Sequence, residues 1–317
     1  MIKIILRIVL ILLILIGGSG IISRFNSNNG RDSVNAEVKR NIEQSGMEND
    51  KNLDKTQSDK DETLEIEDLK RDNSGYLSLE EDINAEDAVV VSENINALVT
   101  GRKRYPVRTD GKKVVYLTFD DGPSITNTPE VLKVLDEYNV KGTFCILGKS
   151  IAKNDDSKKI LKDIVKNGHA VANHTYSHDY NNLYPNGVIN VENFIKDIEK
   201  NNELMRSILG KDFFTRVIRF PGGYWSWDGR EEIKEVLLDK GYVDIFWNAL
   251  NKDAEGCMKN AEQLLSEVKN TVEALGAEAD SIVLLMHDTY GKEETVKSLP
   301  LVIEYFKHNG FEFKTLK

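Results

Sequence analysis

Short runs of apolar residues alternate with amphipathic segments from residue 113 to residue 317, and this alternation constrains the fold more than any other feature of the chain. Short apolar runs are typical of strands that are buried on both faces, and the longer segments carry apolar residues at the spacing of a helix face. The predicted strands are residues 114–119, 142–148, 169–173, 215–220, 242–247, 281–287 and 311–316. The predicted helices are residues 128–138, 158–167, 190–209, 231–240, 261–275 and 295–308.

This regular succession predicts an α/β fold, because each helix returns the chain by a right-handed crossover to begin the next parallel strand. Seven continuous apolar strands favour a barrel over a doubly wound open sheet, which is the alternative architecture. In either fold, catalytic groups gather where the strands end. Polar residues follow five of the seven runs: Asp120 and Asp121, His174 and His178, Arg219, Asp253, and His287 with Asp288. We therefore predict an active site at this edge.

Residues 24 to 100 differ in composition from the rest of the chain. They carry 9 Lys and Arg against 19 Asp and Glu, contain no proline or tryptophan, and have few apolar residues. Such a segment buries too little apolar surface to offset the entropy lost on ordering. The sequence therefore predicts a disordered acidic linker over residues 24–105, with short helices near 63–71 or 85–97 as the only exceptions, and a catalytic domain over residues 106–317.

The first 23 residues predict a membrane-targeting segment. Lys3 and Arg7 precede an apolar run from Ile8 to Ile22, which is interrupted only between Gly17 and Gly20. A spanning helix needs about 20 residues, so the segment is predicted to be either a cleaved signal peptide or an uncleaved anchor. By the positive-inside rule, the rest of the chain lies outside the cell. We expect the domain at the outer face of the cell membrane, or secreted if the segment is cleaved.

Charge and cysteine content exclude several classes of protein. The net charge of −10 argues against a nucleic-acid partner, because binding to phosphate backbones requires a basic face. The two cysteines, Cys145 and Cys257, are too few for a four-cysteine zinc module or a disulfide framework. Any metal must therefore be bound by His, Asp or Glu.

The spacing of His174 and His178 indicates a metal site, because residues four apart present both imidazoles on one side if the loop turns helically. The zinc-protease motif needs a Glu after its first His, whereas this chain has Thr175 there. Asp120 and Asp121 supply the missing parts: one carboxylate joins the two His as a ligand, and the other accepts a proton from the water that the metal activates. Alone, the His pair fits a solvated helix face and the Asp pair fits a turn. Together at strand ends they favour one divalent metal, Zn²⁺ first and Co²⁺ or Ni²⁺ as alternatives.

Five motifs resemble, in the same order, those of the polysaccharide deacetylases, the NodB-homology carbohydrate esterases of family 4. They are TFDDGP at 118–123, NHTYSH at 173–178, RFPGG at 219–223, WNALNKDAEG at 247–256 and LLMHDT at 284–289. The resemblance extends over residues 114–317. It implies a distorted (β/α) barrel and the metal-dependent removal of N-acetyl or O-acetyl groups from a glycan.

The resemblance also implies roles for the residues of the first three motifs. It makes Asp120 the catalytic base and Asp121, His174 and His178 the metal ligands. Arg219 is expected to hold Asp120 by a charge-assisted pair, although an ordinary surface cation is the alternative for this position.

The last two motifs are expected to supply the general acid. The resemblance makes His287 the acid that protonates the leaving amine, and Asp253 the residue that orients His287 and raises its basicity. A satisfied histidine at the boundary of the core is the alternative interpretation of His287.

Two positions depart from the family pattern. Gly222 stands where the third motif commonly has Tyr; its backbone N–H can still contact an oxyanion, but an aromatic groove wall is lost. In the fourth motif, Leu250 and Ala254 replace the usual Asp and Trp. The family pattern therefore does not define the shape of the acetate pocket in this chain. Trp225 and Trp227 are candidates either for stacking on sugar rings or for covering a barrel edge.

The sequence therefore predicts a polysaccharide N-deacetylase, a hydrolase of non-peptide carbon–nitrogen bonds. The predicted partner is an acetylated glycan, either peptidoglycan or chitin-like, with peptidoglycan N-acetylglucosamine first because a domain tethered through residues 1–23 can reach the adjacent wall. The alternatives are a catalytically silent glycan-binding or scaffold protein and a metal-dependent amidase that acts on a small amide.

Overall fold

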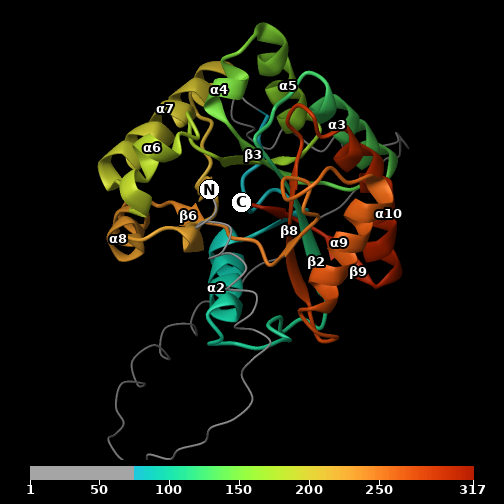
Figure 1. The fold of residues 1–317 in the computed structure, drawn as a ribbon. Helices are drawn as coiled ribbons and strands as arrows, with labels where there is room; N and C mark the ends of the chain where they lie inside the picture. The colour runs from blue at the N-terminus through green and yellow to red at the C-terminus, as the bar shows by residue number, and fades with distance from the viewer. Residues whose placement is uncertain (1–74) are drawn as a thin grey trace, which may run out of the picture. The chain divides into compact units, whose positions relative to one another are not determined.

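The structure, a computed structural model, describes residues 75–317 (Figure 1). These residues form an α/β fold in which helices surround a curled parallel sheet. The predicted targeting segment over residues 1–23 and the predicted linker up to residue 74 lie outside the described residues. Within residues 75–317, no helix combines the length and the apolar character that crossing a membrane requires.

The sheet is a half-barrel of parallel strands, in agreement with the predicted distorted barrel. Its strand order is β6-β5-β4-β3-β2-β8-β7, and β9 pairs in addition with β2. Neighbouring strands run parallel throughout. In this order they are β6 (Val243–Asp244), β5 (Val217–Ile218), β4 (Ala170–Asn173), β3 (Thr143–Ile146), β2 (Lys113–Asp120), β8 (Ser281–His287) and β7 (Ala249–Leu250), with β9 at Phe311–Phe313.

Strand β2 lies at the centre, and seven of its eight residues are buried. Helices cover the outside of the sheet, and their apolar faces join one core with the side chains of β2, β3, β4 and β8. All six predicted helices are present. The helices that contribute to this core are α3 (Asn127–Glu137), α4 (Gly148–Ile151), α5 (Asp155–Lys166), α7 (Val191–Leu209), α9 (Ala261–Glu273) and α10 (Glu293–His308). Helices α6 (Tyr180–Leu183) and α8 (Arg230–Asp239) contribute no residue to it.

Two strand predictions require correction. The sequence does not predict β7, whose two residues pair with Leu284 and Leu285 of β8, because two residues are too few to show a period. The predicted last strand over residues 311–316 is two strands: β9 pairs with β2, and β10 (Thr315–Leu316) pairs with β1 (Ala85–Glu86) in a separate two-stranded sheet.

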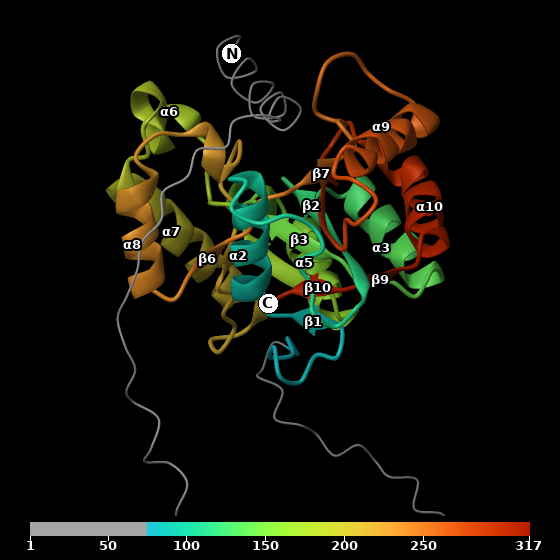
Figure 2. The same ribbon diagram turned by 90° about the horizontal axis from the view of Figure 1, so that it is seen from below.

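The predicted disordered linker extends too far along the chain, because its carboxyl-terminal part contains β1 and α2 (Ala88–Val99). Helix α2 begins after Asp87, whose side chain accepts a hydrogen bond from the N–H of Val89 as an N-cap. Ala88, Val91 and Ile95 are buried against residues of β2, β5 and β8. The short helix expected near residues 85–97 is thus present as α2. The acidic composition of the whole segment conceals only that the apolar stripe of this helix packs into the core of the domain. Helix α2 lies beside β6, at one end of the sheet (Figure 2), and it also contacts β8, near the other end.

Removing α2 is expected to destabilise the domain. A chain that begins at residue 106 loses the buried side chains of Val91 and Ile95, each worth roughly 1.5–3 kcal/mol, and exposes the apolar residues that they cover. We expect its free energy of unfolding to fall by about 5 kcal/mol relative to a chain that begins at residue 75, measured by urea denaturation. Equal midpoints for the two chains would contradict the packing role of α2.

Candidate active site

The catalytic candidates lie together because the strands that carry them end at the same edge of the sheet. Asp120 is the last residue of β2 and lies opposite His287, the last residue of β8. Strand β4 ends at Asn173, directly before His174, and β5 ends directly before Arg219. Parallel strands in this register bring residues from four distant segments to one place.

Asp121, His174 and His178 form a compact cluster of potential metal ligands. Oδ1 of Asp121 lies 3.4 Å from Nε2 of His174 and 3.5 Å from Nε2 of His178. This buried oxygen has no hydrogen-bond partner among the described residues. Three donor atoms thus converge on one point, with an orphaned carboxylate oxygen among them.

The charges around the cluster also fit a divalent cation. Nδ1 of His174 lies 2.8 Å from the carbonyl oxygen of Arg219; a proton on Nδ1 satisfies this contact and leaves the lone pair of Nε2 free. Burial and, to a smaller extent, the neighbouring positive charge of His174 lower the pKa of His178 to about 4, so the His178 ring is neutral. Burial would raise the pKa of Asp121, but the two histidines outweigh it and hold the pKa well below its usual range. Burial would lower the pKa of His174, but the carboxylates of Asp120 and Asp121 outweigh it and raise this pKa. Zn²⁺ binds neutral imidazoles and ionised carboxylates, so a cation here would displace the proton that the two carboxylates favour on His174.

Asp120 lies beside this cluster and is held by Arg219. Nη1 of Arg219 donates to Oδ1 of Asp120 at 3.0 Å, and the second carboxylate oxygen lies 3.8 Å from Nε2 of His174. The guanidinium also donates to Oγ1 of Thr118 and to the carbonyl oxygen of Ile245. Arg219 is only 1% exposed, so it is a buried ion-pair partner rather than a surface cation.

His287 is bound by Asp253 through two hydrogen bonds. Nδ1 of the ring lies 2.7 Å from Oδ1 of Asp253, and the backbone N–H of His287 donates to Oδ2 at 2.9 Å. Oγ1 of Thr295 donates to the same Oδ2. Burial alone would lower the pKa of His287, but the Asp253 carboxylate outweighs burial and raises the pKa to about 9. The imidazole is therefore protonated at neutral pH and can donate a proton from Nε2.

Gly222 occupies a position where a side chain would be crowded and its backbone strained. Its φ is 74°, and a Cβ there would lie 3.0 Å from the ring of Trp227 and 3.1 Å from Oη of Tyr180. The ring of Tyr180 is in turn 5.1 Å from the ring of His178. Gly222 therefore lies close to the metal-ligand cluster, and Tyr180 fills the space beside it.

The two tryptophans that follow this glycine have different surroundings. Trp227 is buried, stacks on Tyr184 with 4.0 Å between ring centroids, and donates to the carbonyl oxygen of Pro221. Nε1 of Trp225 donates to Oδ1 of Asn96, which anchors the half-buried indole to α2. Trp227 is thus a packing residue, while Trp225 joins the third motif to the amino-terminal helix.

Sequence reasoning missed several residues around the site. Tyr180, which is 39% exposed beside His178, follows the second motif and carries no signal of its own. Asp197 and Asn201 are polar residues on the buried face of α7. Their signal is present in the sequence: they lie four residues apart in a helix whose neighbouring positions on that face are apolar.

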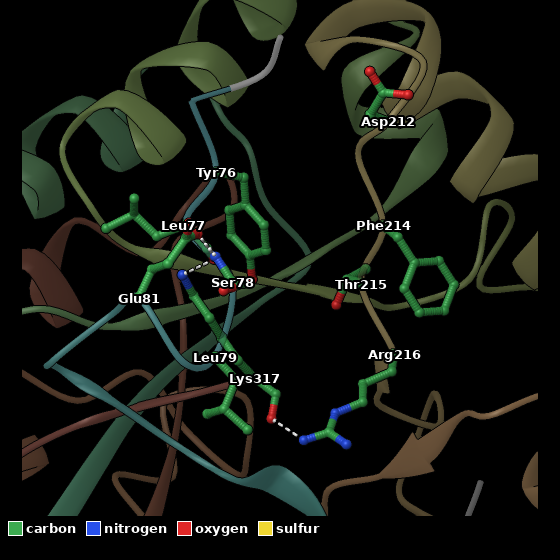
Figure 3. Close-up of a pocket in the computed structure, with 10 residues that line it drawn as sticks. All are labelled: Tyr76, Leu77, Ser78, Leu79, Glu81, Asp212, Phe214, Thr215, Arg216 and Lys317. Carbon is green, nitrogen blue, oxygen red and sulfur yellow. Dashed lines mark hydrogen bonds between the residues drawn. The ribbon is translucent and has the colours of Figure 1, made fainter. Parts of the chain in front are cut away.

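A cavity of about 300 Å³ lies elsewhere in the domain (Figure 3). Thr215 and Arg216 line it and precede the first residue of β5, whereas Arg219 follows the last. The cavity therefore lies near the amino end of β5, and its lining contains none of the residues predicted for catalysis.

Comparison with known proteins identifies the family. The sequence profile of the polysaccharide deacetylases matches residues 107–240. A peptidoglycan-N-acetylglucosamine deacetylase of Bacillus cereus is 32% identical over 212 residues, which cover 65% of this chain and 67% of that protein. A chitooligosaccharide deacetylase of Sinorhizobium fredii is 30% identical over 209 residues, which cover 65% of this chain and 91% of that protein.

The solved structures agree with this assignment. A carbohydrate esterase family 4 enzyme of Streptococcus mutans has a TM-score of 0.66 and 33% identity, over 74% of this chain and 92% of that chain. Both the sequence and the half-barrel are thus shared. The chain belongs to the polysaccharide deacetylases, the NodB-homology carbohydrate esterases of family 4, which are hydrolases of the carbon–nitrogen bond in N-acetyl groups.

Proposed function

We propose that this protein removes N-acetyl groups from an extracellular polysaccharide, with peptidoglycan N-acetylglucosamine as the first candidate substrate. The observation that carries the proposal is the placement of an Asp-His-His cluster beside the Arg219–Asp120 pair, at the edge where His287 lies opposite Asp120. The names of the Bacillus cereus and Sinorhizobium fredii relatives support an acetylated glycan as the substrate class.

Asp121, His174 and His178 are the residues that hold the metal, for which Zn²⁺ is the first candidate and Co²⁺ or Ni²⁺ are alternatives. When bound, the metal supplies a Lewis acid that polarises the acetyl carbonyl and lowers the pKa of water. Asp120 accepts the proton of the attacking water, and Arg219 keeps this carboxylate in place.

The remaining residues act on the substrate. The backbone N–H of Gly222 donates to the oxyanion that forms from the acetyl carbonyl. His287 then gives its Nε2 proton to the nitrogen of the departing amine, so that the carbon–nitrogen bond breaks with a neutral leaving group. Tyr180, half-exposed beside His178, provides an aromatic face for a sugar ring.

The role of His287 predicts the alkaline limit of activity. A group with a raised pKa is competent as an acid below that pKa and loses its proton as the pH rises through it, here at about 9. In Asp253→Asn the stabilising carboxylate is absent, so we expect the alkaline limb of the kcat profile to move down by one pH unit or more. Thr295→Val, which removes an uncharged donor to Asp253 but keeps the carboxylate, is the control and should leave the limb nearly in place. An unmoved limb in Asp253→Asn would show that another group sets it.

The function is tested by acetate release from the full chain, first stripped of metal and then supplied with Zn²⁺ or Co²⁺. The substrates are N-acetylated peptidoglycan and chitooligosaccharides. We expect release that depends on the added metal. Metal binding without acetate release from either substrate would contradict the proposal. It would favour an enzyme that acts on an O-acetylated glycan or on a small amide, or a catalytically silent glycan-binding protein.

We further propose that residues 1–23 attach the protein to the membrane, or direct its secretion, with the catalytic domain outside the cell. The positive charges before the apolar run support this orientation. A reporter fused after residue 317 tests it, because activity of a reporter that functions only in the cytoplasm would contradict the proposed topology.

A further inference from the structure

The loop that carries both histidine ligands has an unfavourable backbone. Thr175 has a φ of 65° and His178 a φ of 51°. Positive φ is rare for residues with a side chain, especially for β-branched ones such as Thr. Such conformations persist only where surrounding contacts fix them. The loop of residues 174–178 therefore requires external support.

One oxygen of Asp197 provides part of this support from α7. Oδ2 accepts hydrogen bonds from the backbone N–H of Tyr176 at 2.9 Å, the backbone N–H of Ser177 at 2.8 Å and the hydroxyl of Ser177 at 3.0 Å. All three donors belong to the residues between the two histidine ligands. A carboxylate bound by several N–H and O–H donors is a strong and directional anchor.

Asn201, one helical turn further along α7, holds the start of the same loop. Its Nδ2 lies within hydrogen-bond distance of the carbonyl oxygens of Ile146 and Thr175 and of Oδ1 of Asn173. Oδ1 of Asn173 also accepts from the N–H of Thr175 at 2.8 Å. Asn201 is fully buried, so these contacts have no competition from water.

We propose that Asp197 and Asn201 are positioning residues that fix the backbone of residues 174–178 so that Nε2 of His174 and Nε2 of His178 converge on Asp121. The inference rests on the proposed metal function. The inference is based on the hydrogen bonds that Asp197 accepts from the segment between the two histidine ligands. A helix that only packed against the sheet would not need a carboxylate on its buried face. Outer groups that orient metal ligands typically contribute about 10- to 100-fold to metal affinity.

The test is the metal affinity of the full chain. Metal is removed with a chelator, and Co²⁺ and Zn²⁺ are titrated back by isothermal calorimetry, for the wild type, Asp197→Ala and Asp197→Asn. Glu199→Gln is the matched control, because this carboxylate lies on the same helix but pairs with Lys240 at the surface. We expect the Kd for metal to rise about 10- to 100-fold in Asp197→Ala, less in Asp197→Asn, and to stay unchanged in Glu199→Gln.

The measurement separates positioning from stability. A residue that only stabilised the fold would lower the Tm of the metal-free protein without changing the Kd of the folded molecules. If Asp197→Ala does not fold, Ser177→Ala, which removes one of the three donors, and Asp197→Asn decide the question. A Kd equal to that of the control in the folded variants overturns the positioning role. A wild type that binds neither metal would instead overturn the proposed metal function itself.

Discussion

Replacing Asp120 by Asn is expected to reduce kcat for acetate release by about 10²- to 10⁴-fold, the usual contribution of a general base. The amide cannot accept the proton of the attacking water, although it keeps the shape of the side chain. Asp121 and both histidines are untouched, so the variant should still bind metal. Arg219 loses its carboxylate partner in a buried site, and some loss of stability is expected as well.

The measurement is steady-state acetate release together with metal content. Asp136→Asn, the same chemical change at an exposed position of α3, is the control. Full activity of Asp120→Asn with metal bound would show that another group takes the proton, and Asp120 would then be only the partner of Arg219.

His174→Ala is expected to remove metal binding and activity together. The cluster retains two of its three ligand atoms, one of them the orphaned oxygen of Asp121. The loss in metal affinity should exceed the roughly 10- to 100-fold that removal of an outer group costs. Metal content after dialysis and acetate release at saturating metal check both parts of the prediction.

His169 supplies a matched control for this variant. It is also a buried histidine and directly precedes β4, but its Nδ1 accepts a hydrogen bond from the backbone N–H of Gly142. Burial lowers its pKa to about 3, so it is neutral. His169→Gln should keep its metal, since an amide oxygen can accept the same bond. Equal metal retention in His174→Ala and His169→Gln would contradict the assignment of His174 as a ligand.

The position of the site could be predicted from the sequence because the strands of β/α folds end at a common edge. The runs before Asp120, His174, Arg219 and His287 are long or apolar enough to be recognised as strands. The helices were predicted to within a few residues, since their apolar periodicity extends over several turns. Strand β7 has two residues, and no periodicity can show in so short a segment.

The folded state of residues 76–105 was decided by tertiary contacts. A short helix near residues 85–97 can be anticipated from the sequence, but a single helix of this length has little stability of its own. Its buried residues are Ala88, Val91, Ser92, Ile95 and Ala97. It forms because the sheet between β6 and β8 offers apolar residues for it to cover. The same packing places Asn96 beside Trp225, which links the amino-terminal helix to the third motif.

The sequence by itself predicted the candidate catalytic and metal-binding residues and their position at strand ends, because residue type and periodicity are local properties. Only the tertiary structure decided that Oδ1 of Asp121 faces both imidazoles and that Arg219 is a buried partner of Asp120. It also decided that Asp197 supports the loop between the two histidines. These relations depend on strand register and on helix packing, which bring together groups up to about a hundred residues apart in the chain.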